Sequence, residues 1–209
     1  MSPLPVDRAD LAVLAAWIAP AENVLDLGCG DGSLLRYLKE EKAVRGYGVE
    51  IEPDNVIACI RNGVNVLQLD LEQGLAGFRD GSFDHVIMSM SLQSVRHTVQ
   101  TLEEMLRVGR VAVVSFPNFG FRKNREAIAG GRMPVSKVLP YQWYDTPNVR
   151  FFTIADFEAL CAERGIAILD RVAFDDDGKR VDADPNFNGS LAMYRLGRAA
   201  PEPAGRKAG

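Results

Sequence analysis

The chain of 209 residues has little cysteine and little histidine, with three of the first and two of the second. Its cysteines, Cys29, Cys59 and Cys161, are scattered and include no Cys-x-x-Cys pair. A disulfide framework requires an even set, and a structural zinc site requires four clustered Cys or His ligands. The sequence supports neither, and we expect no metal site.

The chain also lacks an excess of positive charge and a long apolar run. Its formal net charge is −4, whereas nucleic-acid-binding domains are usually strongly basic. No apolar stretch approaches the ~20 residues of a membrane-spanning helix. The apolar residues 11–19 follow an acidic start instead of the basic start of a signal peptide. We therefore expect a cytoplasmic protein that binds neither nucleic acid nor a membrane.

Glycine is concentrated in one stretch near the N-terminus. Residues 24–33 read VLDLGCGDGS, a short apolar run with an acid, followed by Gly28, Gly30 and Gly32 at alternate positions. This order predicts a strand, a tight turn and a helix, because glycine allows positive φ and close approach of a ligand to the backbone. Open α/β sheets bind their ligands at such corners.

The charge of this turn distinguishes between ligands. A dinucleotide site has the spacing G-x-G-x-x-G around an anionic pyrophosphate, but here the third glycine comes one position early and Ser33 follows it. Asp26 and Asp31 make the turn acidic. Two like charges about 5 Å apart repel by roughly 3 kcal/mol at an effective dielectric of about 20, so a cationic ligand is favoured. The turn resembles the first motif of class I methyltransferases, whose ligand S-adenosylmethionine carries a sulfonium and an ammonium group.

Strand and helix patterns alternate after the turn. The expected strands share short apolar patterns between turn signals and lie at 46–51, 64–70, 83–89, 110–116, 166–174 and 190–196. The last two are expected to pair antiparallel, after a helix that a capping box opens at Thr153. The alternation predicts one α/β domain over residues 1–197, with a doubly wound, mostly parallel Rossmann-like sheet and helices on both faces. We expect residues 198–209 to form a disordered tail.

Three successive strands end with an acid, namely Asp26, Glu50 and Asp70. The carboxyl ends of parallel strands meet at one edge, so the three carboxylates are expected to border one cleft. The second acid can accept from ribose hydroxyls and the third from an adenine amino group, while Ile51 and Leu71 can sandwich the ring. The spacing predicts a site for S-adenosylmethionine or its demethylated product, S-adenosylhomocysteine.

Further residues complete the predicted cofactor site. The backbone N–H of Cys29 is expected to meet the methionine carboxylate, and its thiol is not expected to react. Ser89 ends the fourth strand at the same edge. The predicted set shares this edge: Asp26, Gly28, Cys29, Gly30, Gly32, Glu50, Ile51, Asp70, Leu71 and Ser89. No catalytic residue is predicted, and His85 is interpreted as a core histidine.

The alternation breaks over residues 117–152, where glycine, proline and aromatic residues crowd together. A stretch of this length with little regular structure is usually functional. Two uses are open: a lid over the cleft, or an interface with another protein. Exposed aromatic residues with arginines around them are typical of an interface, and this segment fits that description slightly better.

Over residues 7–195 the chain resembles one family, the MetW proteins of bacterial methionine biosynthesis. The likeness lies in the glycine turn, in 65–75 and 83–89, and most specifically in 131–135 (GRMPV) and 139–148 (LPYQWYDTPN). The resemblance implies a class I methyltransferase-like fold and a role beside homoserine O-acyltransferase, an α/β-hydrolase enzyme. Arg150 departs from the histidine expected in this family after Thr-Pro-Asn-x.

Two functions remain open at this point. In the favoured one, the protein is a partner that activates or stabilises the acyltransferase. In the other, it is an enzyme that transfers a methyl group from S-adenosylmethionine to a small molecule, which requires the nucleophile in line but not a particular base. The fourth strand continues as SMSLQ, without the Asn-Pro-Pro-aromatic signature of amine methylation.

Overall fold

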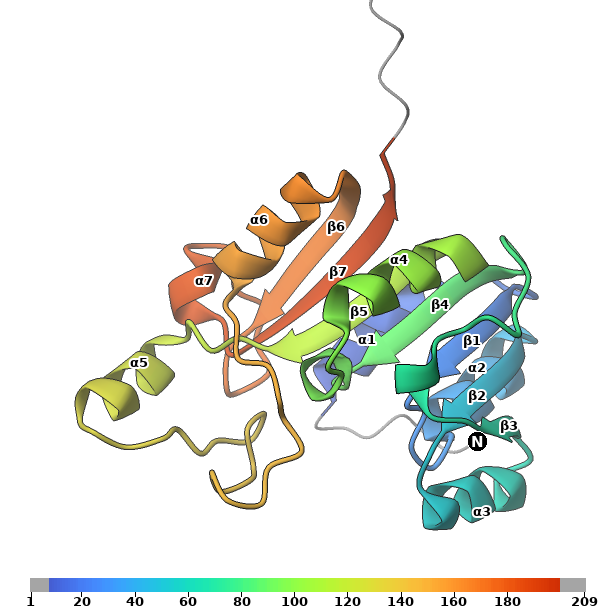
Figure 1. Cartoon of the computed structure of the whole chain (residues 1–209), viewed down its shortest axis with the longest axis horizontal. Coiled ribbons are helices and arrows are strands. Elements are labelled where there is room, and N and C mark those ends of the chain that lie inside the picture. Colours follow the sequence, from blue (N-terminus) through green and yellow to red (C-terminus); the bar gives the residue numbers. More distant parts are fainter. Residues whose placement is uncertain (1–7, 200–209) are drawn as a thin grey trace, which may run out of the picture.

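One mixed sheet organises the chain, whose residues 8–199 are described by a computed structural model. Within these residues the sheet has seven strands in the order β3-β2-β1-β4-β5-β7-β6 (Figure 1). Their bounds are β1 (Asn23–Leu27), β2 (Arg45–Glu50), β3 (Asn65–Gln68), β4 (Phe83–Ser89), β5 (Gly109–Pro117), β6 (Ile166–Phe174) and β7 (Leu191–Arg198). Strands β1 to β5 are parallel, and β7 lies antiparallel to both β5 and β6. The predicted mostly parallel sheet and its antiparallel closing pair are confirmed.

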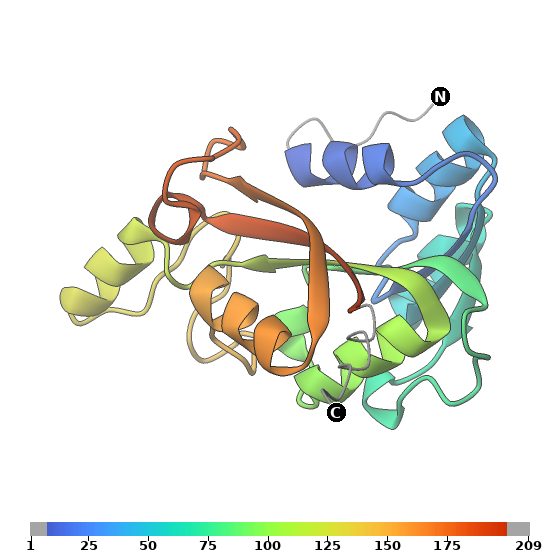
Figure 2. The same ribbon diagram turned by 90° about the horizontal axis from the view of Figure 1, so that it is seen from above.

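Helices cover both faces of this sheet. The helices are α1 (Ala9–Trp17), α2 (Ser33–Lys42), α3 (Pro53–Arg61), α4 (Thr98–Val108), α5 (Arg122–Ala129), α6 (Ile154–Glu163) and α7 (Pro185–Asn188), with short 3-10 turns η1 (Leu71–Gln73) and η2 (Leu92–Ser94). Figure 2 shows α1 and α2 on one side of the sheet and α4 and α6 on the other. The molecule is therefore a three-layer α/β structure.

Each face of the sheet has its own apolar core. On one side Leu14 and Leu35 pack with Ile87, and on the other Leu102 and Phe157 pack with their own strand neighbours. The central strands β1, β4 and β5 are buried on both faces, which is why their sequences are mostly apolar, whereas the edge strands β3 and β6 are more exposed. In α4, apolar residues recur at helical spacing and turn one stripe of the helix to the core.

Two strand ends differ from the sequence prediction. Strand β3 ends at Gln68 and not at Asp70, because Asp70 begins η1, where its carboxylate accepts from the Glu72 N–H at 2.9 Å. Strand β7 continues to Arg198, which pairs with Ile166. Residue 198, the predicted start of the tail, therefore lies in β7, and the rest of the predicted tail, residues 200–209, lies outside the described part of the chain.

The prediction of little regular structure over 117–152 is wrong for part of that segment, since α5 occupies Arg122–Ala129. Its sequence RKNREAIA consists mostly of good helix formers. Its buried Asn124 donates to the carbonyl oxygen of Asn118 at 3.0 Å. Residues 130–153 contain no helix or strand.

The buried side chain of Asn118 joins this segment to the rest of the protein. Its amide nitrogen donates to the carbonyl oxygens of Asn186 at 3.0 Å and Gly189 at 2.8 Å. Its amide oxygen accepts from the N–H groups of Gly120 at 2.9 Å and Ile154 at 3.2 Å. One side chain thus fixes both ends of the segment and the β6–β7 connection.

Replacing Asn118 with alanine should destabilise the protein. The change leaves several buried backbone groups without partners, each of which costs about 1 to 3 kcal/mol, so we expect a loss of at least roughly 2 kcal/mol in urea unfolding. Asn188→Ala is the control, because the Asn188 side chain makes one hydrogen bond, to the Ala183 carbonyl oxygen. Equal losses in the two variants would contradict the assigned role.

Candidate functional site

The predicted strand, turn and helix are present at the carboxyl end of β1. Gly28, Gly30 and Gly32 have φ values of +72°, +56° and +74°, a region that glycine occupies without strain. The N–H of Gly28 donates to the Val49 carbonyl oxygen at 2.8 Å, which holds the turn against the end of β2. At Gly32 a Cβ would lie 2.9 Å from the Cys59 sulfur, so the turn also needs glycine there for space.

The Glu50 carboxylate is the main link between this turn and the next strand. Glu50 ends β2 and is 7% exposed. One carboxylate oxygen accepts from the Gly30 N–H at 2.8 Å, and the other accepts from the N–H groups of Ile51 at 2.8 Å and Glu52 at 3.1 Å. The sequence indicated an acid at this edge but not that the acid would hold the turn in place.

Asp26 is buried within β1 beside this carboxylate. Its side chain is 3% exposed, and no side-chain hydrogen bond to it occurs within residues 8–199. Burial raises the pKa of the Asp26 carboxyl to about 7, and the charge of Glu50 adds to the rise. Two acidic groups held together in this way favour a cationic group beside them.

The other predicted residues lie at or just after the carboxyl ends of β2, β3 and β4. Asp70 and Leu71 are half-buried at η1, and Ile51, at the start of the β2–α3 connection, is 51% exposed. The Gln68 side chain donates to the Ile51 carbonyl oxygen at 3.2 Å and joins these two regions. Ser89 ends β4, with its hydroxyl 3.2 Å from that of Ser115. Asp26 and Glu50 thus lie on the adjacent strands β1 and β2, and Asp70 follows the end of β3, the next strand of the sheet.

The geometry does not fit the expected role of the Cys29 N–H. This group donates to the Val49 carbonyl oxygen at 3.1 Å, so it is not free to meet a ligand carboxylate. The Cys29 sulfur instead lies 3.7 Å from that of Cys59, whose thiol donates to the Gly30 carbonyl oxygen at 3.1 Å. Burial raises the pKa of both thiols, which keeps them protonated and unreactive. The scattered spacing of the cysteines gave no signal for this contact.

His85 lies at the opposite end of the strands from the glycine turn. It is 5% exposed in β4, paired in register with Val24 near the start of β1. Its Nδ1 is 3.1 Å from a carboxylate oxygen of Glu22, and burial lowers its pKa. The interpretation as a core histidine is confirmed, and His85 does not reach the candidate site.

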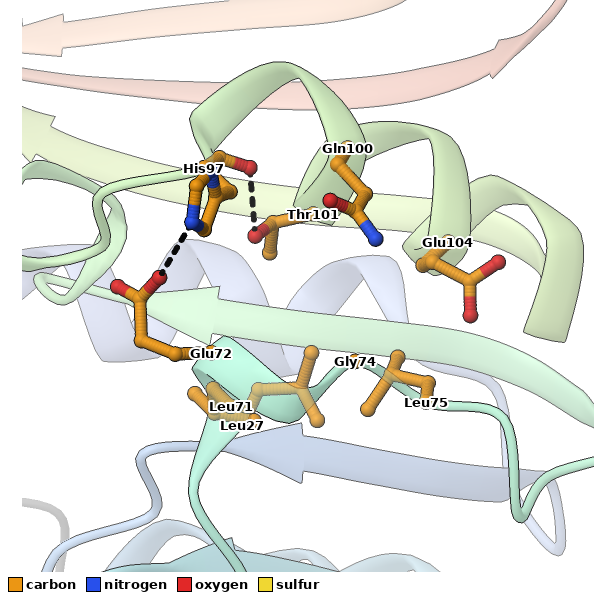
Figure 3. Close-up of a pocket in the computed structure, with 9 residues that line it drawn as sticks. All are labelled: Leu27, Leu71, Glu72, Gly74, Leu75, His97, Gln100, Thr101 and Glu104. Atoms are coloured by element: carbon orange, nitrogen blue, oxygen red, sulfur yellow. Dashed lines mark hydrogen bonds and ion pairs between the residues drawn. The ribbon is translucent and has the colours of Figure 1, made fainter.

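A small pocket adjoins Leu71 (Figure 3). Leu27, Leu71 and Leu75 form its apolar side, and the polar side chains come from η1 and the start of α4. Glu72 connects these elements: its carboxylate accepts from the Arg96 N–H at 2.5 Å and lies 3.8 Å from His97 Nε2.

The segment after β5 contacts the same β4–α4 connection. The N–H groups of Val149 and Arg150 both donate to the Gln93 carbonyl oxygen at 3.0 Å. The Arg150 guanidinium donates to the Arg96 carbonyl oxygen at 2.5 Å. Arg96 therefore lies between the predicted adenine side of the site and residues 117–152, which we call the aromatic segment.

Within residues 8–199 no group of three or more His, Cys, Asp or Glu side chains could hold a metal ion. Over the same range no helix has the length and apolar character to cross a bilayer. The polar groups that do gather at the edge are carboxylates and backbone amides.

The sheet order and the glycine turn define the class of protein as class I methyltransferase-like. A chain from the complex between the Haloferax volcanii Trm112 methyltransferase activator and the putative methyltransferase aligns with a TM-score of 0.70 at 16% identity, over 93% of this chain and 91% of that one. An S-adenosylmethionine-dependent methyltransferase from Mesorhizobium loti aligns with a TM-score of 0.68 at 18% identity, over 91% and 98% of the two chains. At these identities the likeness shows the fold.

Within this class the chain belongs to the MetW family, described as methionine biosynthesis protein MetW, which matches residues 8–196. A relative from Rhodopirellula baltica, the bifunctional methionine biosynthesis protein MetXA/MetW, is 40% identical over 195 residues. The match covers 87% of this chain and 31% of the relative, so the chain spans about a third of the relative's length. The family resemblance seen in the sequence is confirmed.

We expect Asp26→Asn to stabilise the free protein at alkaline pH. The carboxyl has a pKa of 3.8 in its ordinary state and about 7 in the fold. Between these values the native state keeps a proton that the unfolded state has lost, so stability falls as the pH rises and then stays constant above 7. Asparagine removes this cost, so the free energy of unfolding should rise by on the order of 2 kcal/mol at pH 8.

The measurement is urea unfolding of both proteins at pH 5 and pH 8, where the gain should be larger at pH 8. Asp31→Asn is the matched control, because it removes an exposed acid from the same turn. An Asp26→Asn protein that matches the wild type at both pH values would show that Asp26 carries no such cost.

Proposed function

We propose that the protein binds S-adenosylmethionine or S-adenosylhomocysteine at the edge formed by Asp26, Glu50 and Asp70. We also propose that it acts in methionine biosynthesis as a partner that activates or stabilises homoserine O-acyltransferase. The observation that carries the ligand assignment is the buried Asp26 beside Glu50, next to a glycine turn with three positive φ values.

The residues at this edge fit the ligand from end to end. The ammonium group would offset the charge of Asp26, which is buried and without a hydrogen bond among the described side chains. An ionised carboxylate has about four acceptor positions, and Glu50 uses three for backbone N–H groups, which leaves about one for a ribose hydroxyl. Ile51 and Leu71 would flank the adenine, with Asp70 at its amino group. Gly28, Cys29, Gly30, Gly32 and Ser89 would complete the wall.

The partner role draws on the Rhodopirellula baltica relative. Its name places MetXA and MetW in one chain, and we take MetXA as the homoserine acyltransferase half. Joining two modules raises their local concentration, which is useful when the two proteins act in contact. The interpretation of residues 117–152 as an interface, favoured by their aromatic residues and arginines, agrees with this role.

A second candidate function is methyl transfer to a small molecule. It is favoured by the methyltransferase fold and by the ligand edge. Methyl transfer requires alignment of nucleophile and sulfonium more than a dedicated base, so the position of His85 far from the edge does not argue against it. Release of S-adenosylhomocysteine during incubation with cell metabolites would distinguish this function from a partner role.

Glu50→Ala should weaken binding of S-adenosylmethionine at least tenfold in calorimetry. The change removes the ribose acceptor, and hydrogen bonds to a charged group contribute about 1.5 to 3 kcal/mol each. It also removes the acceptor of the Gly30 N–H, which loosens the turn. Glu52→Ala, an exposed neighbour, should bind normally. A wild-type protein that binds neither S-adenosylmethionine nor S-adenosylhomocysteine would reject the ligand assignment.

The partner role predicts that the protein changes the activity or lifetime of the purified acyltransferase. We expect a stable complex, and an affinity for S-adenosylmethionine that differs between the free protein and the complex by about 5- to 150-fold, the usual range of linked sites. Calorimetric titration of the ligand into each form measures this factor.

Three outcomes separate the parts of this prediction. An acyltransferase that neither binds the protein nor changes in activity with it would reject the partner role. Complex formation with identical ligand dissociation constants would show that the two sites are independent. Arg150→Ala should reduce any measured coupling, because it removes the contact with Arg96, whereas the exposed Arg122→Ala should preserve it.

A further inference from the structure

Large apolar side chains are unusually exposed within residues 133–151. Those with exposed fractions between 40% and 72% are Met133, Val135, Tyr141, Trp143, Tyr144, Val149 and Phe151. We call these residues the aromatic surface. Single soluble domains rarely expose a contiguous apolar patch of this kind unless it contacts another molecule.

A cavity of about 290 Å³ opens within the aromatic surface. Its apolar walls are Phe119, Met133, Leu139, Tyr141, Trp143 and Phe151. The volume is sufficient for a large apolar side chain from a partner. Aromatic residues around a pocket that a partner's anchor residue fills are the usual energetic centre of a protein interface.

This surface is held in place although it contains no helix or strand. Ser136 and Leu139 close a turn through two hydrogen bonds, at 2.9 and 3.2 Å, and Leu139 is 5% exposed. The rings of Phe119 and Phe151 pack at 5.0 Å. Val149 is bonded to Gln93 on the body of the protein. A preformed surface loses less conformational entropy on binding, which favours its use as an interface.

Charge adds a second feature to the surface. Arg132 and Arg150 are exposed beside the apolar centre, and neither forms an ion pair within residues 8–199. The Arg150 guanidinium donates to the backbone carbonyl oxygens of Val149 and Arg96, so its charge, like that of Arg132, is not balanced by a carboxylate among the described residues. A partner surface complementary to this one would present one large apolar side chain with carboxylates near it.

We propose that the aromatic surface is the docking site for homoserine O-acyltransferase, with an apolar side chain of that enzyme in the cavity and its carboxylates at Arg132 and Arg150. This inference rests on the proposed partner role. The occupant is chosen because the Rhodopirellula baltica relative carries MetXA in the same chain as MetW. Figure 1 shows that α5 and the loop after it project beyond the sheet, where a second protein has access.

The test measures binding of the full-length protein to the purified acyltransferase of the same cells by interferometry. Trp143→Ala and Met133→Glu should each raise the dissociation constant at least tenfold, whereas Trp143→Phe should retain most of the affinity. Trp143 is 72% exposed and Met133 is 48% exposed, so the fold should persist, and thermal melting checks this. Ile60→Ala is the matched control, since Ile60 is 64% exposed on α3, away from the aromatic surface.

The possible failures are distinct. If the wild type does not bind the acyltransferase, the proposed partner role fails and the occupant fails with it. If the wild type binds but Trp143→Ala and Met133→Glu bind as tightly as Ile60→Ala, the docking site is wrong and the partner role stands. If sedimentation shows a dimer that Trp143→Ala dissociates while acyltransferase binding is unchanged, the occupant is a second copy, and the proposal is overturned.

Discussion

The candidate site depends on one carboxylate. Glu50 accepts three backbone N–H groups, one from the glycine turn after β1 and two from the connection after β2. Within the turn the Gly32 N–H donates to the Cys29 carbonyl oxygen at 3.0 Å. Because glycine can adopt many conformations, the bonds to Glu50 and those to Val49 are what hold the turn against β2. A ligand that uses Glu50 therefore meets an edge already arranged by the same group.

Asp26 has the opposite relation to stability. A carboxyl that is buried beside another acid, with its pKa raised to about 7, costs free energy at neutral pH, and an apolar or amide side chain of similar size would avoid that cost. Natural sequences break such local rules mainly where function requires it. The cost at Asp26 and the bonding at Glu50 are complementary: Glu50 keeps the edge ordered, and Asp26 is an acid whose ionised form a neighbouring cation would stabilise.

The sequence predicted those features that depend on local pattern. Alternating apolar runs and turn signals were sufficient to predict the parallel strands. The positions of Gly28, Gly30 and Gly32 were sufficient to predict the turn. Contacts between distant parts of the chain had no local signal: Cys59 under the turn, and Asn118 as the junction of three segments. Helix α5 was not predicted, because the glycine and proline residues on both sides of this short run of good helix formers indicated irregular structure. The backbone N–H of Cys29 was wrongly predicted to meet the ligand carboxylate, because its actual acceptor, the Val49 carbonyl oxygen, belongs to another strand.

Arg96 shows how the two proposed sites can communicate. Its N–H donates to Glu72, in the turn that contains Leu71, and its carbonyl oxygen accepts from Arg150 at the end of the aromatic segment. Both hydrogen bonds use backbone groups of the same residue, Arg96, so a shift of the β4–α4 connection moves them together. Contact alone does not create coupling: a ligand or a partner shifts the connection only if it binds two arrangements of it with different affinity. Gln93 constrains these arrangements, because its carbonyl oxygen accepts two consecutive N–H groups, those of Val149 and Arg150. An alternative arrangement must therefore move the segment as a unit or break both bonds, and this favours two discrete states over gradual displacement.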